Sequence, residues 1–260
     1  MIKKYKTLLD EKKYHIKCAG VILSWYSEKD NGMYDAINKG FAHATGDIYA
    51  YINSDDTYVP GTFQKIVSSF EKFPEIQWLK GTTCVIKENG ELMRRTPCFI
   101  YNQSWIQKGI YGRYAYFIQQ ESVFWRKELW QKIDGIDTQF KLAGDYWLWK
   151  QFARHEPLWS LDEEIACFRR VSSSLSNRDQ GLGYRAAQKI IIPPSHDFLE
   201  KKIMMFFWLT NKLTPLKPFW IFVYPLLFKK LKPNYVSLKM GIPAILKTKS
   251  YVVSWHEKNH

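Results

Sequence analysis

Residues 201–260 contain no arginine and a single acidic residue, Glu257, beside 11 lysines. The whole chain of 260 residues has a net charge of +13, but residues 1–200 carry 27 Lys and Arg against 24 Asp and Glu. The excess positive charge therefore lies in the last segment, and residues 1–200 are nearly neutral. Nucleic-acid-binding proteins use arginine heavily, so a basic segment without arginine argues against a nucleic-acid partner.

The chain also lacks an apolar run long enough to cross a bilayer, which takes about 20 residues. The longest candidate, Phe219–Phe228, has ten residues and contains Pro225. The first residues are rich in lysine and have no apolar core of the kind found in secretory signal peptides. From these absences we expect a cytoplasmic location.

Cysteine motifs for metal binding or redox chemistry are absent. Cys18, Cys84, Cys98 and Cys167 lie far apart, with no C-x-x-C and no Cys/His spacing for a metal. We expect all four to be reduced, buried thiols with a structural role. The sequence also has no glycine-rich phosphate loop, no serine nucleophile turn and no H-E-x-x-H motif, which excludes the enzyme classes that these motifs define.

Hydrophobic residues make up 46% of the chain, enough for a well-packed core. The apolar spacing predicts helices at 3–13, 34–45, 61–73, 126–133 and 145–155, and buried strands at 21–25 and 47–52. Short strands with turns are expected over 76–118, including a hairpin at Asn89–Gly90. This order is typical of an α/β sheet, whose ligands bind beyond the carboxyl ends of the strands.

The first candidate site is Asn53–Ser54–Asp55–Asp56, which follows the predicted strand 47–52. Two adjacent carboxylates at that position suit Mg²⁺ or Mn²⁺, which take their remaining ligands from water and phosphate oxygens. The simpler alternative is an Asx turn that caps the next helix. A carboxylate pair with one raised pKa is a further alternative.

The second candidate is Asp145, at the start of the predicted helix 145–155 in the sequence AGDYWLW. A carboxylate is stabilised at a helix N-terminus, so a simple cap is the ordinary interpretation. The functional interpretation is a general base, because an aspartate held at a helix start beside Tyr146 and Trp147 is rigid and partly shielded.

Two further clusters carry polar groups suited to a sugar nucleotide. Gln119–Gln120–Glu121 is followed by Phe124 and Trp125; amides and a carboxylate recognise hydroxyls, and aromatic rings stack on sugar faces. Arg169 and Arg170 offer two guanidinium groups to a diphosphate. The alternatives are a polar strand end and a solvated arginine pair.

Taken in order, these segments resemble the family 2 glycosyltransferases of GT-A fold, over about residues 1–190. The resemblance is carried by SEKDNGMYDAINKG at 27–40, ATGDI at 44–48, NSDD at 53–56, QQESVFW at 119–125, AGDYWLW at 143–149 and CFRR at 167–170. It implies an α/β, GT-A (Rossmann-like) fold and inverting transfer from a nucleotide-diphosphate sugar. The implied acceptor is a glycan or a lipid-linked molecule in surface polysaccharide biosynthesis.

The resemblance also implies roles for individual residues. Asp145 corresponds to the general base, and Asp55 with Asp56 to the metal and donor motif, with Asp56 the more direct ligand of Mg²⁺ or Mn²⁺. The residues implied for binding the donor nucleotide-sugar are Asp30, Asp35, Lys39, Asp55, Arg169 and Arg170. Gln120 and Glu121 correspond to the acceptor side.

The same resemblance begins in the helix that follows the family's second strand. We therefore expect a glycosyltransferase domain at 1–200 that is truncated at its N-terminus, lacks its first donor-binding strands and has weak or no activity alone. A non-catalytic remnant in a membrane polysaccharide assembly is the alternative, and a single-strand nucleic-acid-binding protein is a third, less favoured one.

Residues 201–260 form a basic, aromatic extension that prolines divide into short pieces. Tryptophan and tyrosine favour the lipid headgroup level, and lysines are attracted to anionic lipid. We expect either peripheral contact with the cytoplasmic face of a membrane or a helical subdomain packed on the domain at 1–200.

Overall fold

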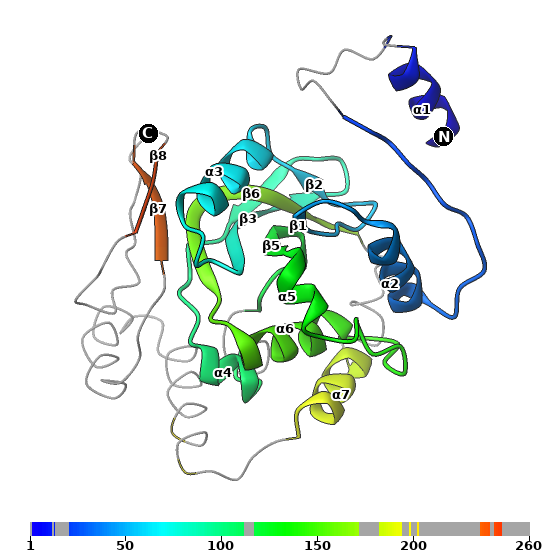
Figure 1. Ribbon diagram of the computed structural model, residues 1–260. Coiled ribbons are helices and arrows are strands. Elements are labelled where there is room, and N and C mark those ends of the chain that lie inside the picture. Colours follow the sequence, from blue (N-terminus) through cyan, green and yellow to red (C-terminus); the bar gives the residue numbers. More distant parts are fainter. Residues whose placement is uncertain are drawn as a thin grey trace.

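The computed structural model describes residues 2–11, 13, 21–111, 117–171, 182–193, 198 and 202, and the backbone of two more strands at 235–239 and 242–245. One mixed sheet forms the centre of the fold (Figure 1). Its order is β1 (Ile48–Tyr49), β5 (Val123–Arg126), β3 (Trp78–Lys87), β6 (Trp159–Arg170), β7 (Tyr235–Lys239) and β8 (Ile242–Ile245); β2 (Thr57–Tyr58) also pairs with β6, and β4 (Leu92–Arg95) with β3. The pairs β3–β6 and β6–β7 are parallel and the others antiparallel.

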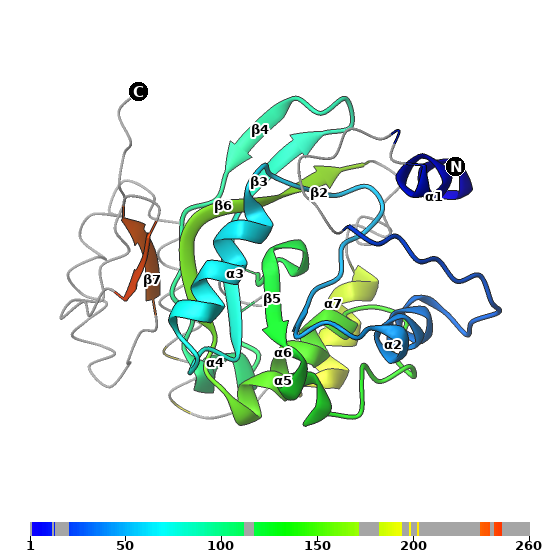
Figure 2. The same ribbon diagram turned by 45° about the horizontal axis from the view of Figure 1, so that its top comes forward.

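Helices lie on both faces of this sheet, and Figure 2 shows α3 along the sheet with α5 and α6 grouped below it. The helices are α1 (Ile2–Asp10), α2 (Met33–His43), α3 (Thr62–Lys72), α4 (Gln103–Gln107), α5 (Lys127–Gln131), α6 (Gly144–His155) and α7 (Leu182–Ile191), with a 3₁₀ turn η1 (Gln120–Ser122). The expected α/β architecture is therefore confirmed, as are the helices predicted from apolar spacing.

Alternation along the strands divides the core between the two faces. On β5, Trp125 packs in a cluster with Trp149 and Phe152 of α6, whereas its neighbour Phe124 packs in a second cluster with Phe70 of α3. Successive side chains of a strand point to opposite faces, so one short strand supplies both clusters. The first cluster is strongly aromatic, with the Trp125 and Phe152 ring centroids 5.4 Å apart.

The hairpin between β3 and β4 is also confirmed. Gly90 adopts a positive φ of 89°, and its N–H donates to the carbonyl of Lys87 at 2.9 Å. The Asn89 side chain accepts a hydrogen bond from the N–H of Glu91 at 3.0 Å. An Asn-Gly pair satisfies both requirements of such a turn, since Gly tolerates positive φ and Asn bonds to the nearby backbone.

The buried strand predicted at Val21–Trp25 is wrong. Residues 21–30 form neither helix nor strand and are almost entirely exposed, with Ile22 exposed at 87%. In both views this segment leads away from the sheet toward α1, none of whose residues is buried. An apolar β-branched run becomes a strand only where a neighbouring strand pairs with it, and the described sheet offers none here.

The expectation of four reduced cysteines is also wrong, because Cys84 and Cys167 form a disulfide. The parallel register of β3 and β6 pairs these residues directly, with Cα atoms 4.5 Å apart. They are 83 residues apart in the chain, so no local spacing motif announces the pairing. Cys98 is free and partly buried, and Cys18 lies outside the described residues.

The division expected at residue 200 precedes a segment, 201–260, most of which lies outside the described residues. The two strands that are described there, β7 and β8, extend the sheet beyond β6. No helix in the described part of the chain combines the length and apolar character needed to cross a bilayer.

Replacing Gly81 with alanine is expected to destabilise the protein, because Gly81 of β3 packs directly against β6. An added Cβ would overlap the Ile165 side chain and lie 2.9 Å from the carbonyl oxygen of Glu163. Overpacking of this kind lowers the unfolding free energy by about 1–3 kcal/mol. Urea denaturation measures the change.

The matched control is Gly40→Ala on α2, where nothing lies within 4 Å of an added Cβ. Alanine favours a helix by roughly 1 kcal/mol over glycine, so this variant should be slightly stabilised. A Gly81→Ala variant as stable as the unmodified protein would contradict the close pairing of β3 with β6.

Candidate active site

The adjacent carboxylates Asp55 and Asp56 occupy the turn between β1 and β2, and they differ in exposure. Asp55 is exposed, whereas Asp56 is buried, with 8% of its surface accessible. Asp56 Oδ1 accepts a hydrogen bond from the N–H of Arg169 at 2.8 Å, and Oδ2 accepts one from Asn53 Nδ2 at 3.2 Å. Burial raises the pKa of Asp56, while the Arg169 N–H lowers it. The hydrogen bond from Arg169 thus holds this turn at the end of β6.

Arg169 and Arg170, at the end of β6, have different surroundings. The Arg169 guanidinium donates from Nε to the carbonyl of Asp55 at 2.8 Å, and from Nη1 to the carbonyls of Lys87 and Glu88 at 3.2 and 3.0 Å. It therefore connects the acidic turn with the β3–β4 hairpin. Arg170 is exposed beside it, so its charge is accessible to an anionic ligand.

Asp145 lies in the first turn of α6, after an unusual backbone conformation. Ala143 has φ 61°, the one positive φ among the described non-glycine residues. Gly144 follows it, where a Cβ would overlap the ring of Tyr34, and its N–H donates to the Tyr34 hydroxyl at 2.7 Å. Strain in a turn of this type is typical of sites that fix a functional side chain.

Asp145 is half-buried, and its carboxylate is held by two hydrogen bonds. Its Oδ1 accepts from the Tyr146 N–H at 2.8 Å and from the Tyr184 hydroxyl at 2.9 Å. Desolvation raises the pKa of Asp145 to about 6, and these hydrogen bonds oppose the rise. A carboxylate with a pKa near neutrality is well suited to accept a proton from a substrate.

The 3₁₀ turn η1, whose Glu121 interacts electrostatically with both acidic positions, carries buried polar groups without partners. Both side-chain amide atoms of Gln120 and Oε1 of Glu121 make no hydrogen bond within the described structure. Glu121 has 1% of its surface accessible and interacts electrostatically with both Asp56 and Asp145. Buried polar atoms normally have partners, so these atoms are available to water or to a ligand.

A buried lysine lies close to Glu121. Lys80 of β3 donates from Nζ to the carbonyl of Gly81 at 2.8 Å. Desolvation lowers the pKa of Lys80 and raises that of Glu121, and Asp56 and Asp145 raise the pKa of Glu121 further. At neutral pH the glutamic acid therefore retains its proton, which limits the repulsion among the three acidic side chains.

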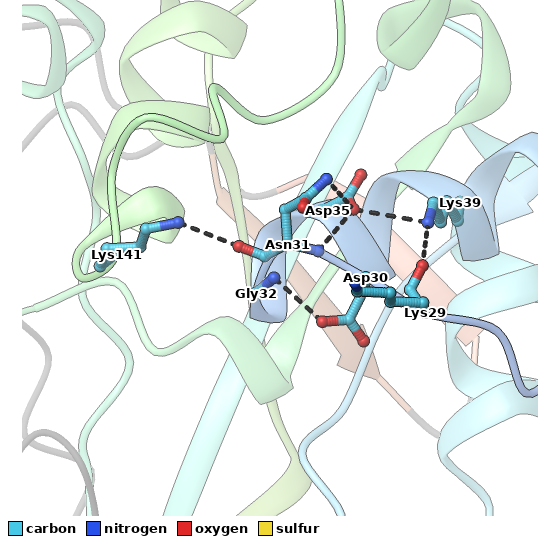
Figure 3. A network of polar contacts seen from close by, with 7 residues as sticks. All are labelled: Lys29, Asp30, Asn31, Gly32, Asp35, Lys39 and Lys141. Atoms are coloured by element: carbon cyan, nitrogen blue, oxygen red, sulfur yellow. Dashed lines mark hydrogen bonds and ion pairs between the residues drawn. The ribbon is translucent and has the colours of Figure 1, made fainter.

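The third predicted group, Asp30, Asp35 and Lys39, forms a polar network around the start of α2 (Figure 3). Asp30 Oδ1 accepts from the Gly32 N–H at 2.9 Å, and Asp35 Oδ2 from the Asn31 N–H at 2.8 Å. The Asn31 hydrogen bond is the main cause of a lowered pKa of Asp35, and Lys39 lies 3.5 Å from the same carboxylate. These contacts order the loop before α2.

The network is joined to the segment that leads into α6. Lys141 Nζ donates to the carbonyl of Asn31 at 2.9 Å, and Tyr34 of α2 contacts Gly144. The structure thus brings the acidic turn, Arg169, Glu121 and Asp145 into one region. It places Asp30, Asp35 and Lys39 beside that region, with their own contacts mainly within the α2 loop.

Several residues of this region carry no sequence motif. Tyr34, Tyr51 and Tyr184 all interact with Asp145, from α2, from the segment after β1 and from α7. Lys80 lies in an apolar strand pattern. No sequence spacing relates these residues to Asp145. The one sequence feature that points to any of them is the position of Tyr34 in the segment 27–40, which resembles the family 2 glycosyltransferases.

The acidic turn fits a divalent cation of the Mg²⁺ type. Asp55 is exposed, and each Asp56 oxygen accepts only one of the hydrogen bonds described above, so lone pairs remain. Such cations are commonly held by one or two carboxylates together with water and substrate phosphates. Among the described residues, no group of three or more His, Cys, Asp or Glu side chains is placed to hold a metal.

Comparison with known proteins gives matches at the family level. Residues 12–131 match Glycosyl transferase family 2. Two curated relatives from Mycobacterium tuberculosis, the uncharacterized glycosyltransferases MT1564 (strain CDC 1551 / Oshkosh) and Rv1514c (strain ATCC 25618 / H37Rv), are each 28% identical over 122 residues, which is 46% of this chain and 44% of theirs. The match therefore spans less than half the length of these relatives.

Among solved structures, the chain is similar to a crystal structure of S. aureus TarS 1–349 in complex with UDP-GlcNAc. The TM-score is 0.47 at 14% sequence identity, and the similarity covers 87% of this chain and 69% of that one.

Replacing Glu121 with glutamine is expected to flatten the pH dependence of stability. The folded state raises the pKa of Glu121 from its ordinary 4.5 to about 8, so between these values the folded protein holds a proton that the unfolded chain has released. The unfolding free energy therefore falls as the pH rises through this window, by at most about 1.4 kcal/mol per pH unit. Glutamine keeps the neutral shape without the titration.

Urea denaturation at pH 5.5, 6.5 and 7.5 measures this effect. The difference between Glu121→Gln and the unmodified protein should grow with pH in favour of the variant. Glu91→Gln, at an exposed position in the β3–β4 hairpin, is the control and should show no such trend. Parallel pH profiles for Glu121→Gln and the unmodified protein would mean that Glu121 ionises normally.

Proposed function

We infer that this chain, a family 2 glycosyltransferase by the match of residues 12–131, transfers a sugar from a nucleotide-diphosphate sugar to an acceptor hydroxyl. The observation that carries the proposal is Asp145, a half-buried residue at a strained helix start whose carboxyl pKa is raised to about 6. The acidic turn at Asp55 and Asp56 is near enough for Glu121 to interact electrostatically with both Asp56 and Asp145. A proton acceptor and a diphosphate site are the two groups that sugar transfer requires.

In the proposed reaction Asp145 accepts the proton of the acceptor hydroxyl. The hydroxyl oxygen forms a bond to the anomeric carbon as the bond from that carbon to the diphosphate oxygen breaks. The electron pair of the broken bond leaves with the nucleoside diphosphate. Attack from the face opposite the leaving group inverts the anomeric configuration, and one carboxylate base is sufficient for this single step.

The leaving diphosphate is proposed to bind at the acidic turn. A Mg²⁺ or Mn²⁺ ion held by Asp56 and Asp55 would neutralise its charge. Arg170 is exposed at the end of β6 and is suited to contact the phosphates directly. Arg169 is already bonded to the turn and the hairpin, so we assign it the role of holding Asp55 and Asp56 in position.

The remaining residues are proposed to contact the sugars and the nucleotide. Gln120 and Glu121 present buried polar atoms without partners, which suits hydroxyl recognition on the acceptor side. Asp30 lies in the ordered loop before α2, and Asp35 and Lys39 lie in α2 itself (Figure 3); we assign this segment to the donor nucleotide.

The main test is turnover of UDP-sugars, including UDP-N-acetylglucosamine, with Mn²⁺, measured as UDP release. Asp145→Asn should reduce kcat at least about a hundredfold, because a general base contributes 10²- to 10⁴-fold. In the pH profile of activity of the unmodified protein, the acid limb should have its midpoint near pH 6, since only the ionised carboxylate of Asp145 accepts the proton. A chelator should abolish turnover.

Asp134→Asn, an exposed position in the turn after α5, is the matched control and should keep full activity. Unfolding midpoints of both variants show whether they remain folded. Full turnover by a folded Asp145→Asn variant would refute the assigned base, and turnover that persists in chelator would refute the metal.

The acceptor is proposed to be a glycan or a lipid-linked molecule of surface polysaccharide assembly, reached at the cytoplasmic face of a membrane. Support comes from the sequence of 201–260, where 11 lysines accompany tryptophans, tyrosines and phenylalanines.

Flotation with liposomes tests this membrane contact. The full chain should float with vesicles that contain an anionic phospholipid, and should float less as salt is added, because screening weakens charge attraction. A variant lacking 201–260 should remain in the lower fraction. Equal flotation of both proteins would remove the membrane assignment from this segment.

A further inference from the structure

The helix α7 contributes a side chain to the Asp145 carboxylate from outside the segment that matches the family. The match ends at residue 131, and α7 spans Leu182–Ile191. Its Tyr184 hydroxyl donates to Asp145 Oδ1 at 2.9 Å, across 39 residues of sequence. Among the described residues outside α6, Tyr184 is therefore the one that donates a hydrogen bond to this carboxylate.

The position of α7 does not depend on that hydroxyl. Ile191 and Ile192 are buried in one apolar cluster with Ala143 and Tyr146. Lys150 of α6 donates from Nζ to the carbonyl of Ile191 at 2.8 Å, which ties the end of α7 to α6. The Tyr184 ring also contacts Phe117 edge-on, with centroids 5.8 Å apart.

The tyrosine ring would therefore stay in place without its oxygen, since the ring and helix contacts remain. The hydroxyl adds one thing, which is the hydrogen bond to Asp145. Within the part of the chain that the structure describes, both hydrogen bonds to this carboxylate end on Oδ1, one from Tyr146 N–H and one from Tyr184. Two donors on one oxygen fix the rotation of the carboxylate.

We propose that Tyr184 is a positioning residue for the general base, whose hydroxyl holds Oδ1 of Asp145 so that Oδ2 is presented to the acceptor hydroxyl. This inference rests on the proposed function of Asp145. The proposal gives α7, which follows β6 in the chain, a role in catalysis through the contact of Tyr184 with Asp145.

The other titratable groups that face Asp145 do not replace this hydrogen bond. Tyr34 of α2 accepts from the Gly144 N–H, and the negative charge of Asp145 helps to raise the pKa of Tyr51 after β1. Glu121 of η1 also interacts with Asp145, and its burial favours the neutral acid. Burial raises the pKa of Tyr34, Tyr51 and Tyr184 alike, so these phenols stay neutral near pH 7.

Removing the Tyr184 hydroxyl has a defined consequence for Asp145. A hydrogen bond donated to a carboxylate favours its ionised form, so its loss raises the pKa of the carboxyl group. At pH 6 to 7 a smaller fraction of Asp145 would then be able to accept a proton. The loss of activity should be largest at low pH and smallest above pH 8.

The experiment compares Tyr184→Phe with the unmodified chain by two measurements. The first is the titration of the Asp145 side-chain carbon by ¹³C NMR, with the signal assigned by its absence in Asp145→Asn. The second is the pH profile of UDP release from UDP-N-acetylglucosamine with Mn²⁺. Both the titration midpoint and the acid limb should move upward by about one pH unit in Tyr184→Phe.

Tyr146→Phe is the matched control on the same side of the molecule. Its hydroxyl donates to the carbonyl of Gly109 at 2.8 Å rather than to Asp145, and its backbone N–H is unchanged by the substitution. This variant should lower the unfolding midpoint and leave the titration of Asp145 where it was.

The outcomes separate the inference from the function on which it rests. Upward shifts of both midpoints in Tyr184→Phe support the inference. An unmoved titration in a folded Tyr184→Phe variant, with Asp145→Asn inactive, overturns the inference alone. Full turnover by Asp145→Asn overturns the proposed function and with it the catalytic role of Tyr184, whatever the NMR titration shows.

Discussion

The parallel pairing of β3 with β6 holds the acidic-turn side of the candidate site together, because it brings residues far apart in sequence to one end of the sheet. The pairing runs from Leu79 opposite Trp159 to Lys87 opposite Arg170, and it includes the Cys84–Cys167 disulfide. It brings the end of β6 beside the β3–β4 hairpin, where Arg169 bonds to Lys87 and Glu88 as well as to the acidic turn. The antiparallel pairing of β2 with the same strand, Thr57 opposite Cys167, places Asp56 beside the Arg169 N–H that binds its carboxylate.

Desolvation of carboxylates is the second organising feature. Glu121 interacts electrostatically with both Asp56 and Asp145, and burial is the largest cause of the raised pKa of each of the three. Their surroundings nevertheless differ: Asp56 receives a backbone N–H, Glu121 lies near Lys80, and Asp145 receives a tyrosine hydroxyl. Three acidic groups in one region can thus hold a cation, stay neutral and accept a proton, respectively.

The sequence predicts those features that depend on local pattern. Apolar spacing predicts α2, α3 and α6. Asp55 is identified as a candidate by its position shortly after a predicted strand, and Asp145 by its position at the start of a predicted helix. Tyr184 and the disulfide partners could not be predicted, since each contact is made by tertiary pairing between distant segments. The strand expected at Val21–Trp25 fails for the opposite reason: its residues favour a strand, but no described strand lies beside it to pair with.

The acidic turn and the start of α6 are proposed to be two halves of one sugar-transfer site. A crystal structure with Mn²⁺ and a non-transferable UDP-sugar analogue tests this most directly, because anomalous scattering locates manganese. The expected result is manganese at Asp56 and Asp55 with the diphosphate beside it, and the sugar between that position and Asp145. Manganese and diphosphate bound away from the acidic turn, or a sugar out of reach of the Asp145 carboxylate, would contradict the assignment.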